Sequence, residues 1–370
     1  SCLSFSSHRF VQSLFNVLTM KILIVTPSWK ILGGVANHYQ GLAPYWTENI
    51  SYVIQGKRQH ISAVFTLIPD YFRYVWSLIF HRPDVVIVNP SLRWYQLVRD
   101  CLYVIIALML RIKVVTFIHG WSPDVAASIS NHPYWFRKTF GKSAFIYVLY
   151  SKFKETLDNL NLQAPVLLTT TKVADNLVKN FDVKCRGGKI DNILFLTRIE
   201  IIKGIVTTLQ CFKELKEKYP NVKLSVCGTG TALPLAKEFV SRYNLKDVTF
   251  YGNVSGDNKI EQFENADVYI LPTYGEGMAT SVLEAMAFGL PVLTCPVGGV
   301  NDFFEEGKMG FFIESQNAST SIVKLEWMIN NPDKVKSMSL LNAAYAKHNF
   351  LASAVAKRFE NDIKRLSDEG

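Results

Sequence analysis

The sequence lacks an apolar run long enough to cross a bilayer. Its longest one, residues 101–110, is followed by the charged Arg111 and Lys113, whereas a membrane-spanning helix needs about 20 apolar residues. Residues 1–19 lack the charged start, long apolar centre and cleavage site of a signal peptide. Because residues 20–27 are typical of the opening strand of an α/β domain, we expect residues 1–19 to be a peripheral extension.

Recognisable metal and disulfide patterns are also absent. The six cysteines are scattered and include no C-x-x-C pair and no metal-ligand spacing with histidine. Most of them are expected to be small core residues of a reduced, cytosolic protein. No metal site is predicted.

Acidic residues are scarce in the first half of the chain. Residues 1–187 contain 20 Lys and Arg against 9 Asp and Glu, whereas residues 188–370 contain 20 against 22. The positive field of the first half could attract nucleic acid, an anionic membrane surface or an acidic substrate. Nucleic acid is the least expected of these, because the basic residues are dispersed and form no known binding motif.

The 370 residues, 49% of them hydrophobic, are enough for two α/β domains with sizeable cores. Short apolar runs alternate with helical periodicity along the whole chain. Predicted strands include residues 21–26, 85–88, 114–118, 193–196, 223–227, 248–251, 268–271, 291–295 and 310–313. Residues 69–80 are predicted to form a helix that packs Phe72, Val75, Trp76, Ile79 and Phe80 on the sheet. Residues 183–189 break the core pattern and are the predicted linker.

Residues 267–299 give the strongest chemical signal. They are predicted to form strand, turn, helix and strand, which places the turn at the carboxyl end of a parallel strand, where ligands bind. Glu276 and Glu284 flank this turn. Small residues between them would let backbone N–H groups approach an anion, and carboxylates accept hydrogen bonds from diols, so the pattern favours a sugar nucleotide. The alternative is a simple helix start, with Ser281 and Glu284 as a capping box.

The spacing of Glu276 and Glu284, with seven residues between them, lies within P-T-Y-G-E-G, S-V-L-E-A-M-A-F-G-L-P-V and V-G-G-V segments. This combination resembles the E-x7-E signature of retaining glycosyltransferases of family 4, and the similarity extends from about residue 20 to the C-terminus. The resemblance implies the GT-B fold, in which two Rossmann-like domains face one another across a cleft. It implies an acceptor domain of residues 20–185, completed by a final helix in 351–370, and a donor domain of residues 186–350.

The resemblance also implies roles in the second domain. Arg198 and Lys203 match the R-x-x-x-x-K-G loop that binds the donor diphosphate, with Thr197 in place of a common glycine. Glu276 would hold hydroxyls of the donor sugar and Glu284 those of the ribose. Backbone donors to the diphosphate would come from the helix start, which comprises Gly277, Met278, Ala279 and Thr280.

Further positions are implied at the ends of other strands. Gly33 and Gly34 match first-loop glycines that approach the donor phosphates. His119, at the end of a predicted strand, matches a histidine close to the donor sugar; taken alone it would be a structural histidine. Gly228 and Gly252 match turns near the nucleotide base.

Family membership would imply transfer of a sugar with retention at the anomeric carbon. No Asp-x-Asp motif is present, so protein cations are expected to replace a metal, and no cofactor is predicted. Residues 131–142 mix aromatic and cationic side chains, which suits either a membrane-docking element or a helix edge with its aromatic rings packed inward. We expect a peripheral enzyme on the cytoplasmic leaflet that takes a nucleotide sugar and a saccharide or lipid-linked saccharide acceptor of a surface polysaccharide.

Three alternatives stay open at this point. A sugar-nucleotide epimerase of similar fold would bind the same donor without an acceptor. A dinucleotide oxidoreductase is disfavoured because the first loop lacks a clear G-x-G-x-x-G followed by a ribose-binding acid. A non-catalytic membrane-associated subunit would be expected to lose Arg198, Lys203 or Glu276, all of which are present.

Overall fold

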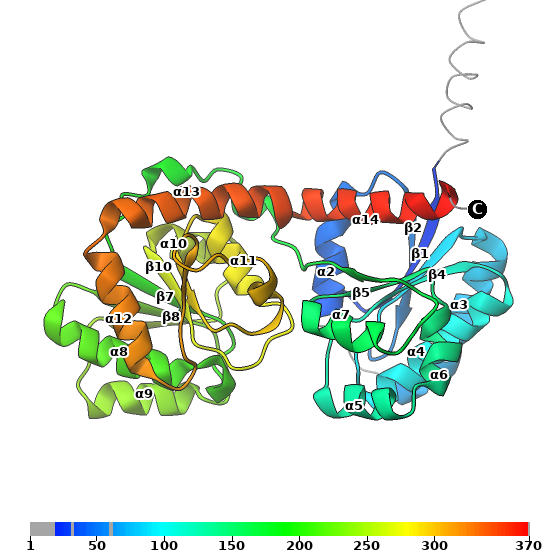
Figure 1. Cartoon of the computed structure of the whole chain (residues 1–370), viewed down its shortest axis with the longest axis horizontal. Coiled ribbons are helices and arrows are strands. Elements are labelled where there is room, and N and C mark those ends of the chain that lie inside the picture. The colour runs from blue at the N-terminus through cyan, green and yellow to red at the C-terminus, as the bar shows by residue number, and fades with distance from the viewer. Residues whose placement is uncertain (1–18, 31–32, 59–61, 369–370) are drawn as a thin grey trace, which may run out of the picture. The chain divides into compact units, whose positions relative to one another are not determined.

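A computed structural model of the chain describes residues 19–30, 33–58 and 62–368. The chain divides into two compact units. The first comprises residues up to Thr169 together with those from Val355 onward, and the second comprises residues 170–354. Each unit is a parallel sheet covered by helices (Figure 1). Except for Thr19, the predicted extension of residues 1–19 lies outside the described residues.

The first unit is built on a six-stranded parallel sheet in the order β2-β1-β3-β4-β5-β6. Nearly continuous apolar runs form its central strands, as expected for a sheet that is buried on both faces. The strands are β1 (Lys21–Pro27), β2 (Asn49–Gln55), β3 (Val85–Val88), β4 (Lys113–Phe117), β5 (Phe145–Val148) and β6 (Val166–Leu168).

Helices of the first unit connect these strands. They are α2 (Gly34–Leu42), α3 (Ala63–His81), α4 (Trp94–Met109), α5 (Pro123–Asn131), α6 (Tyr134–Lys138) and α7 (Ser151–Asp158). The strand order reverses between β2 and β3, so right-handed connections place α2 on one face of the sheet and α3 and α4 on the other. Within the described residues, no helix combines the length and apolarity needed to cross a bilayer.

The last helix, α14 (Ala352–Asp368), packs against the first unit beside α2. The ring of Phe359 contacts those of Phe117 and Tyr147. The buried carboxylate of Glu360 accepts hydrogen bonds from the backbone N–H groups of Thr47 and Glu48 at 2.6 and 2.9 Å. These contacts make α14 part of the first unit's packing.

Helix α3 differs from the sequence prediction in both its start and its buried face. It begins at Ala63, six residues before the predicted start. Phe72, Trp76 and Phe80 are 70%, 53% and 61% exposed, whereas Tyr74 is fully buried. The Tyr74 hydroxyl donates to the carbonyl of Tyr103 at 2.9 Å. Because this hydrogen bond satisfies the hydroxyl, Tyr74 can be buried. A prediction based on hydropathy alone therefore assigned the wrong face of the helix to the core.

Residues 131–142 also differ from a membrane-docking element. The rings of Phe136 and Phe140 are fully buried and Trp135 is half-buried. Arg137 donates to the carbonyl of Leu160 at 2.5 Å. The segment is therefore a helix edge with most of its aromatic rings packed inward.

The second unit has a six-stranded parallel sheet in the order β12-β11-β10-β7-β8-β9. Its strands are β7 (Asn192–Leu196), β8 (Lys223–Cys227), β9 (Val248–Gly252), β10 (Val268–Leu271), β11 (Val292–Thr294) and β12 (Gly310–Phe312). Its helices are α8 (Ile205–Lys218), α9 (Leu233–Arg242), α10 (Gly256–Asn265), α11 (Thr280–Ala287), α12 (Ala318–Ile329) and α13 (Pro332–Asn349). The prediction of two Rossmann-like α/β domains is confirmed.

The predicted linker, residues 183–189, is anchored in the second unit. Arg186 is buried, and its guanidinium donates to backbone carbonyls of Phe263, Glu264, Ala266 and Phe288. The division between the units falls between Thr169 and Thr170 instead of at residues 185 and 186. The prediction of a linker rested on glycines beside a charged residue. The charge of Arg186 can nevertheless be buried, because its guanidinium has five N–H donors and can bond several carbonyls at once.

Replacing Arg186 with Met should therefore destabilise the second unit. The loss of charge-assisted hydrogen bonds leaves buried carbonyls without partners, and we expect the free energy of unfolding to fall by about 2–4 kcal/mol. Urea unfolding followed by circular dichroism measures the change. The matched control is Lys184→Met, because Lys184 is exposed on the same segment. Equal stability of the two variants would contradict an anchoring role for Arg186.

Candidate active site

The second sheet has a topological switch point between β7 and β10. From β7 the chain proceeds outward to β8 and β9, and then returns to the other side of β7 with β10. Loops after the two strands at such a point diverge and leave a crevice at their carboxyl ends. Residues 197–203 follow β7 and residues 272–279 follow β10, so the two strongest sequence motifs lie together at this point.

Backbone and side-chain hydrogen bonds hold these two loops against each other. The buried Thr273 hydroxyl donates to the carbonyl of Ile202 at 3.1 Å, and the Tyr274 N–H donates to the same carbonyl at 3.2 Å. Gly204 has a φ of +80°, and a Cβ there would lie 2.2 Å from the Pro272 carbonyl oxygen. This close approach requires glycine, which explains the glycine that follows Lys203.

The paired loops bring Lys203 and Glu276 together. The Lys203 ammonium lies 2.5 Å from a carboxylate oxygen of Glu276, and the two side chains are only 10% and 15% exposed. Arg198 is exposed on the same loop as Lys203. The predicted phosphate cation and the predicted sugar-binding carboxylate therefore form an ion pair with each other.

Tyr269 of β10 connects the end of β7 with the start of α11. Its buried hydroxyl donates to the Leu196 carbonyl at 2.9 Å and lies 2.7 Å from the Ser281 hydroxyl. Burial raises the pKa of the Tyr269 hydroxyl, so it stays protonated. Strand β10, the end of β7 and the start of α11 are thereby fixed relative to one another.

Helix α11 begins without the capping box. Ala279 is its N-cap residue and provides no side-chain cap, while Ser281 is engaged by Tyr269. The capping-box explanation of Ser281 and Glu284 is therefore wrong. An N-terminus without a side-chain cap has backbone N–H groups that can bind an anion.

The predicted backbone donors of α11 lie on a compact turn. The Gly299 N–H donates to the Gly277 carbonyl at 2.8 Å, and a Cβ at Gly298 would lie 2.4 Å from the Glu276 carbonyl oxygen. The V-G-G-V segment, residues 297–300, thus packs directly against the turn. Met278 packs against the hydrophobic core, and the Thr280 hydroxyl lies 3.2 Å from that of Thr171.

Glu284 forms a second ion pair that sequence reasoning missed. Lys259 of α10 lies 2.7 Å from its carboxylate. Lys172 is also nearby and buried; burial lowers its pKa, and the Glu284 carboxylate opposes that shift. Both lysines come from segments remote in sequence, and no motif marked them.

The two predicted glycine turns lie at the ends of β8 and β9, where Gly228 follows β8 and Gly252 is the last residue of β9. A Cβ at Gly228 would lie 1.9 Å from the Thr197 carbonyl oxygen, so this glycine lets the turn pack on the loop that carries Arg198. Gly252 has a φ of +68° with open space around its Cβ position. The two turns are joined by a hydrogen bond of 2.6 Å from the Gly228 N–H to the Gly252 carbonyl.

The first unit holds the remaining predicted residues. Gly33 is the N-cap residue of α2 and Gly34 its first residue; a Cβ at either would meet no described atom within 4 Å. Packing with the described residues therefore does not require glycine at these positions.

His119 follows β4 and belongs to a buried polar network. Asn89, which follows β3, donates from its side-chain NH2 to the Val25 carbonyl at 2.9 Å, and this contact fixes its orientation. Its Oδ1 atom then accepts from the Tyr39 hydroxyl at 2.7 Å and lies 3.0 Å from His119 Nε2. Because Oδ1 only accepts, His119 carries its proton on Nε2. Sequence reasoning missed Asn89 and Tyr39.

The imidazole of His119 is neutral near pH 7. Burial, and to a lesser degree the neighbouring His38, lower the pKa of His119 well below its ordinary value of 6.5. The predicted site residues thus form one group in each unit, with ion pairs in the second and a neutral imidazole in the first. Among the described residues, no three His, Cys, Asp or Glu side chains gather as metal ligands.

The lowered pKa of His119 should make the protein less stable in acid. Below about pH 6.5 the unfolded imidazole binds a proton that the folded one does not, so the free energy of unfolding falls as pH falls. Relative to His119→Gln, the wild type should lose up to about 1.4 kcal/mol per pH unit in this range. Thermal unfolding across this range measures the difference. The control is the exposed His348→Gln, which should follow the wild type; a parallel pH dependence of His119→Gln would contradict the prediction.

Comparison with known proteins identifies a family that is similar to part of this chain. Residues 181–344 match the family model of glycosyl transferases group 1. An uncharacterized glycosyltransferase of Haemophilus influenzae is 30% identical over 159 residues, which cover 42% of this chain and 45% of that protein. A lipopolysaccharide 1,2-N-acetylglucosaminetransferase of Salmonella typhimurium is 29% identical over 196 residues, covering 48% and 49%. The chain thus spans about half the length of these curated relatives.

A solved structure extends the similarity in fold to both units. The crystal structure of HepE from Anabaena in complex with UDP-glucose aligns with 94% of this chain and 100% of that chain, with a TM-score of 0.69 and 15% identity. At this identity the likeness concerns the fold, and it confirms the GT-B prediction as regards the two α/β units. The matched segment contains Arg198, Lys203, Glu276 and Glu284. The match to the glycosyl transferases group 1 covers residues 181–344, which lie within the second unit.

Proposed function

We propose that the chain is a glycosyltransferase that moves a sugar from a nucleotide-sugar donor to a saccharide acceptor, with retention at the anomeric carbon. The observation that carries this proposal is the Lys203–Glu276 ion pair at the switch point of the second sheet. A cation and a carboxylate in contact at such a place suit a ligand that has both phosphate charge and hydroxyl groups.

In the proposed complex, the donor diphosphate takes the place of Glu276 as the partner of Lys203. Arg198 and the backbone donors at the start of α11 add to this site, so negative charge that develops on the leaving group is stabilised. The Glu276 carboxylate is then released to hold hydroxyls of the donor sugar. These protein cations supply the positive charge in the proposed mechanism, and it needs no metal.

Glu284 is the proposed partner of the ribose hydroxyls. Its ion pair with Lys259 holds the carboxylate in a fixed orientation. The glycine turns at Gly228 and Gly252 lie at the ends of neighbouring strands and are the proposed surroundings of the base. A uridine nucleotide is favoured because HepE of Anabaena, which shares the fold, was crystallised with UDP-glucose.

In the first unit, His119 is proposed to recognise a sugar hydroxyl. A neutral imidazole whose Nε2 proton is held by Asn89 offers Nδ1 as an acceptor, and it adds no charge near a phosphate. Gly33 and Gly34 are the proposed points at which a ligand approaches the backbone of this unit.

The proposed acceptor is a lipid-linked saccharide of a surface polysaccharide, with the enzyme held peripherally on the cytoplasmic leaflet. The Salmonella typhimurium relative is a lipopolysaccharide N-acetylglucosaminetransferase, which supports this class of acceptor. The excess of Lys and Arg in residues 1–187 favours an anionic surface.

Nucleotide binding tests the donor site. In a thermal-shift panel of UDP, GDP, ADP and CMP with the common UDP- and GDP-sugars, one nucleotide class should stabilise the wild type. A ligand at about 100 times its dissociation constant stabilises by roughly 2.7 kcal/mol. Arg198→Ala and Lys203→Ala should each weaken binding about 10- to 150-fold, because each removes a charge-assisted bond of roughly 1.5–3 kcal/mol.

The matched control for this panel is Lys218→Ala, which removes an exposed lysine paired with Glu326 on the same unit. It should bind as the wild type does. If no nucleotide shifts the melting temperature of well-folded wild type, the donor site is refuted and a non-catalytic role gains support.

Product analysis tests the reaction itself. With the donor identified and a matching acceptor supplied, NMR of the product should show the anomeric configuration of the donor, and EDTA should not change the rate. Glu276→Gln should reduce transfer by at least about 100-fold while nucleotide diphosphate binding stays within a few-fold, because the carboxylate is proposed to contact the sugar. Conversion of the donor sugar without an acceptor would indicate an epimerase, and an inverted product would refute retention.

A further inference from the structure

Two neighbouring helices of the first unit, α3 and α4, expose apolar faces. On α3 the exposed residues are Phe65, Ile68, Phe72, Trp76, Ile79 and Phe80, and on α4 they include Tyr95, Val98, Leu102 and Met109. Most neighbours within each set are three or four residues apart, and Leu102 and Met109 are seven apart, or two helical turns, so each set forms one stripe along its helix. Rings of Tyr71 and Tyr74 on α3 contact Tyr103 of α4, so the two helices lie side by side. Together these stripes form the α3/α4 face.

The opposite sides of both helices already supply the core. Tyr74 and Leu78 of α3 and Leu97 and Val104 of α4 are buried against the sheet. Helix α3 therefore has two apolar sides, with Asp70, Arg73 and Ser77 between them, a pattern typical of helices that are covered on both sides. Its 19 residues extend over roughly 28 Å. An exposed apolar surface of this extent marks an interaction site.

Neither of the two helices exposes a carboxylate. The only acidic residues of the two helices, Asp70 and Asp100, are buried and paired with arginines. Exposed cations lie at the helix ends: Arg82 follows α3, Arg93 precedes α4 and Arg111 follows it.

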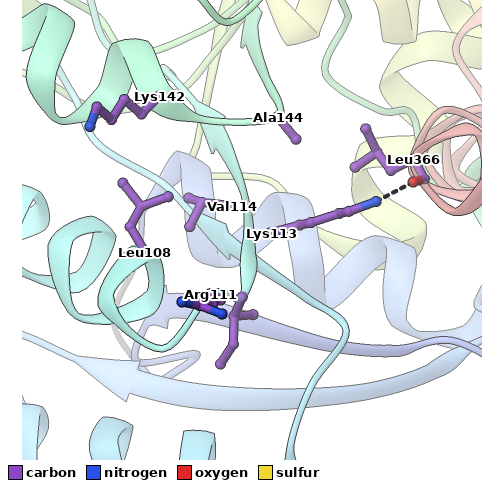
Figure 2. Close-up of a pocket in the computed structure, with 8 residues that line it drawn as sticks. Leu108, Arg111, Lys113, Val114, Lys142, Ala144 and Leu366 are labelled. Carbon is purple, nitrogen blue, oxygen red and sulfur yellow. Dashed lines mark hydrogen bonds between the residues drawn. The ribbon is translucent and has the colours of Figure 1, made fainter. Parts of the chain in front are cut away.

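A pocket at the end of α4 continues this positive charge. It has a volume of about 410 Å³, and three of its eight described lining residues, Arg111, Lys113 and Lys142, are cations (Figure 2). None of the eight is acidic. The Lys113 ammonium donates to the Leu366 carbonyl, while Lys142 reaches the pocket from another segment.

We propose that the α3/α4 face docks on an anionic lipid bilayer, with Phe72 and Trp76 inserted among the headgroups and the flanking arginines on lipid phosphates. Aromatic rings favour the interfacial zone, Lys and Arg favour anionic headgroups, and an apolar face without exposed carboxylates meets no repulsion there. A protein partner is less favoured, because the exposed face offers no carboxylate with which basic groups of a partner could pair. The inference deepens the proposed function, on which it rests for its purpose, and it replaces residues 131–142 as the docking element.

Vesicle flotation of the full chain tests this docking. The wild type should float with phosphatidylcholine vesicles that contain phosphatidylglycerol, and much less with phosphatidylcholine alone. Phe72→Ser with Trp76→Ser should weaken binding at least about tenfold. Arg82→Gln with Arg111→Gln should abolish the preference for phosphatidylglycerol. The matched control is Leu235→Ser with Val323→Ser, which changes two exposed apolar residues of the second unit and should float as the wild type does.

Nucleotide binding by the same samples separates this inference from the proposed function. The Phe72 and Trp76 variant should keep the wild-type thermal shift with nucleotide, which also shows that it is folded. Loss of nucleotide binding in all samples with vesicle binding intact would refute the donor site but leave the docking surface. The docking proposal is overturned if the wild type does not float, if the variants float equally, or if light scattering shows a dimer that the Phe72 and Trp76 variant converts to a monomer.

Discussion

The partly buried ion pair of Lys203 and Glu276 is the constraint on which the second unit is organised. Removing two charges from water is costly, and here each charge offsets the cost of the other. The pair forms only because Thr273 and Gly204 hold the loops after β7 and β10 in contact. In the proposed donor complex the ligand replaces both partners, which favours a ligand with anionic and hydroxyl groups over a simple anion. Glu284 with Lys259 repeats this arrangement on α11.

In the first unit the central polar group is uncharged. His119 is kept neutral by burial, and Asn89 fixes which nitrogen carries its proton. A neutral acceptor can bind a hydroxyl at any pH near neutrality, and its strength does not depend on salt, unlike that of an exposed charge. The two units therefore offer different chemistry: fixed charges that suit phosphate and diols in the second, and a neutral hydrogen-bonding network in the first.

Much of the fold was predictable because fully buried parallel strands are continuous apolar runs. The bounds of β3, β8 and β10 were predicted without error, and Lys203 and Glu276 were recognised from their motifs and do meet in the structure. Strands β2, β5 and β6 were not predicted. Strand β2, Asn49–Gln55, lies at the edge of its sheet and mixes polar with apolar residues, so it has no such run.

The sequence by itself determined the alternating α/β pattern, the excess of positive charge in the first half and the motif residues at the ends of strands, because these depend on local composition and spacing. The tertiary structure alone decided which partners those residues have. Arg186 is buried because backbone carbonyls from a helix distant in sequence accept its hydrogen bonds. The apolar stripe of α3 is exposed because Tyr74, on the opposite side, is buried with a hydrogen-bond acceptor on α4. Such partners are distant in sequence, and no local pattern encodes them.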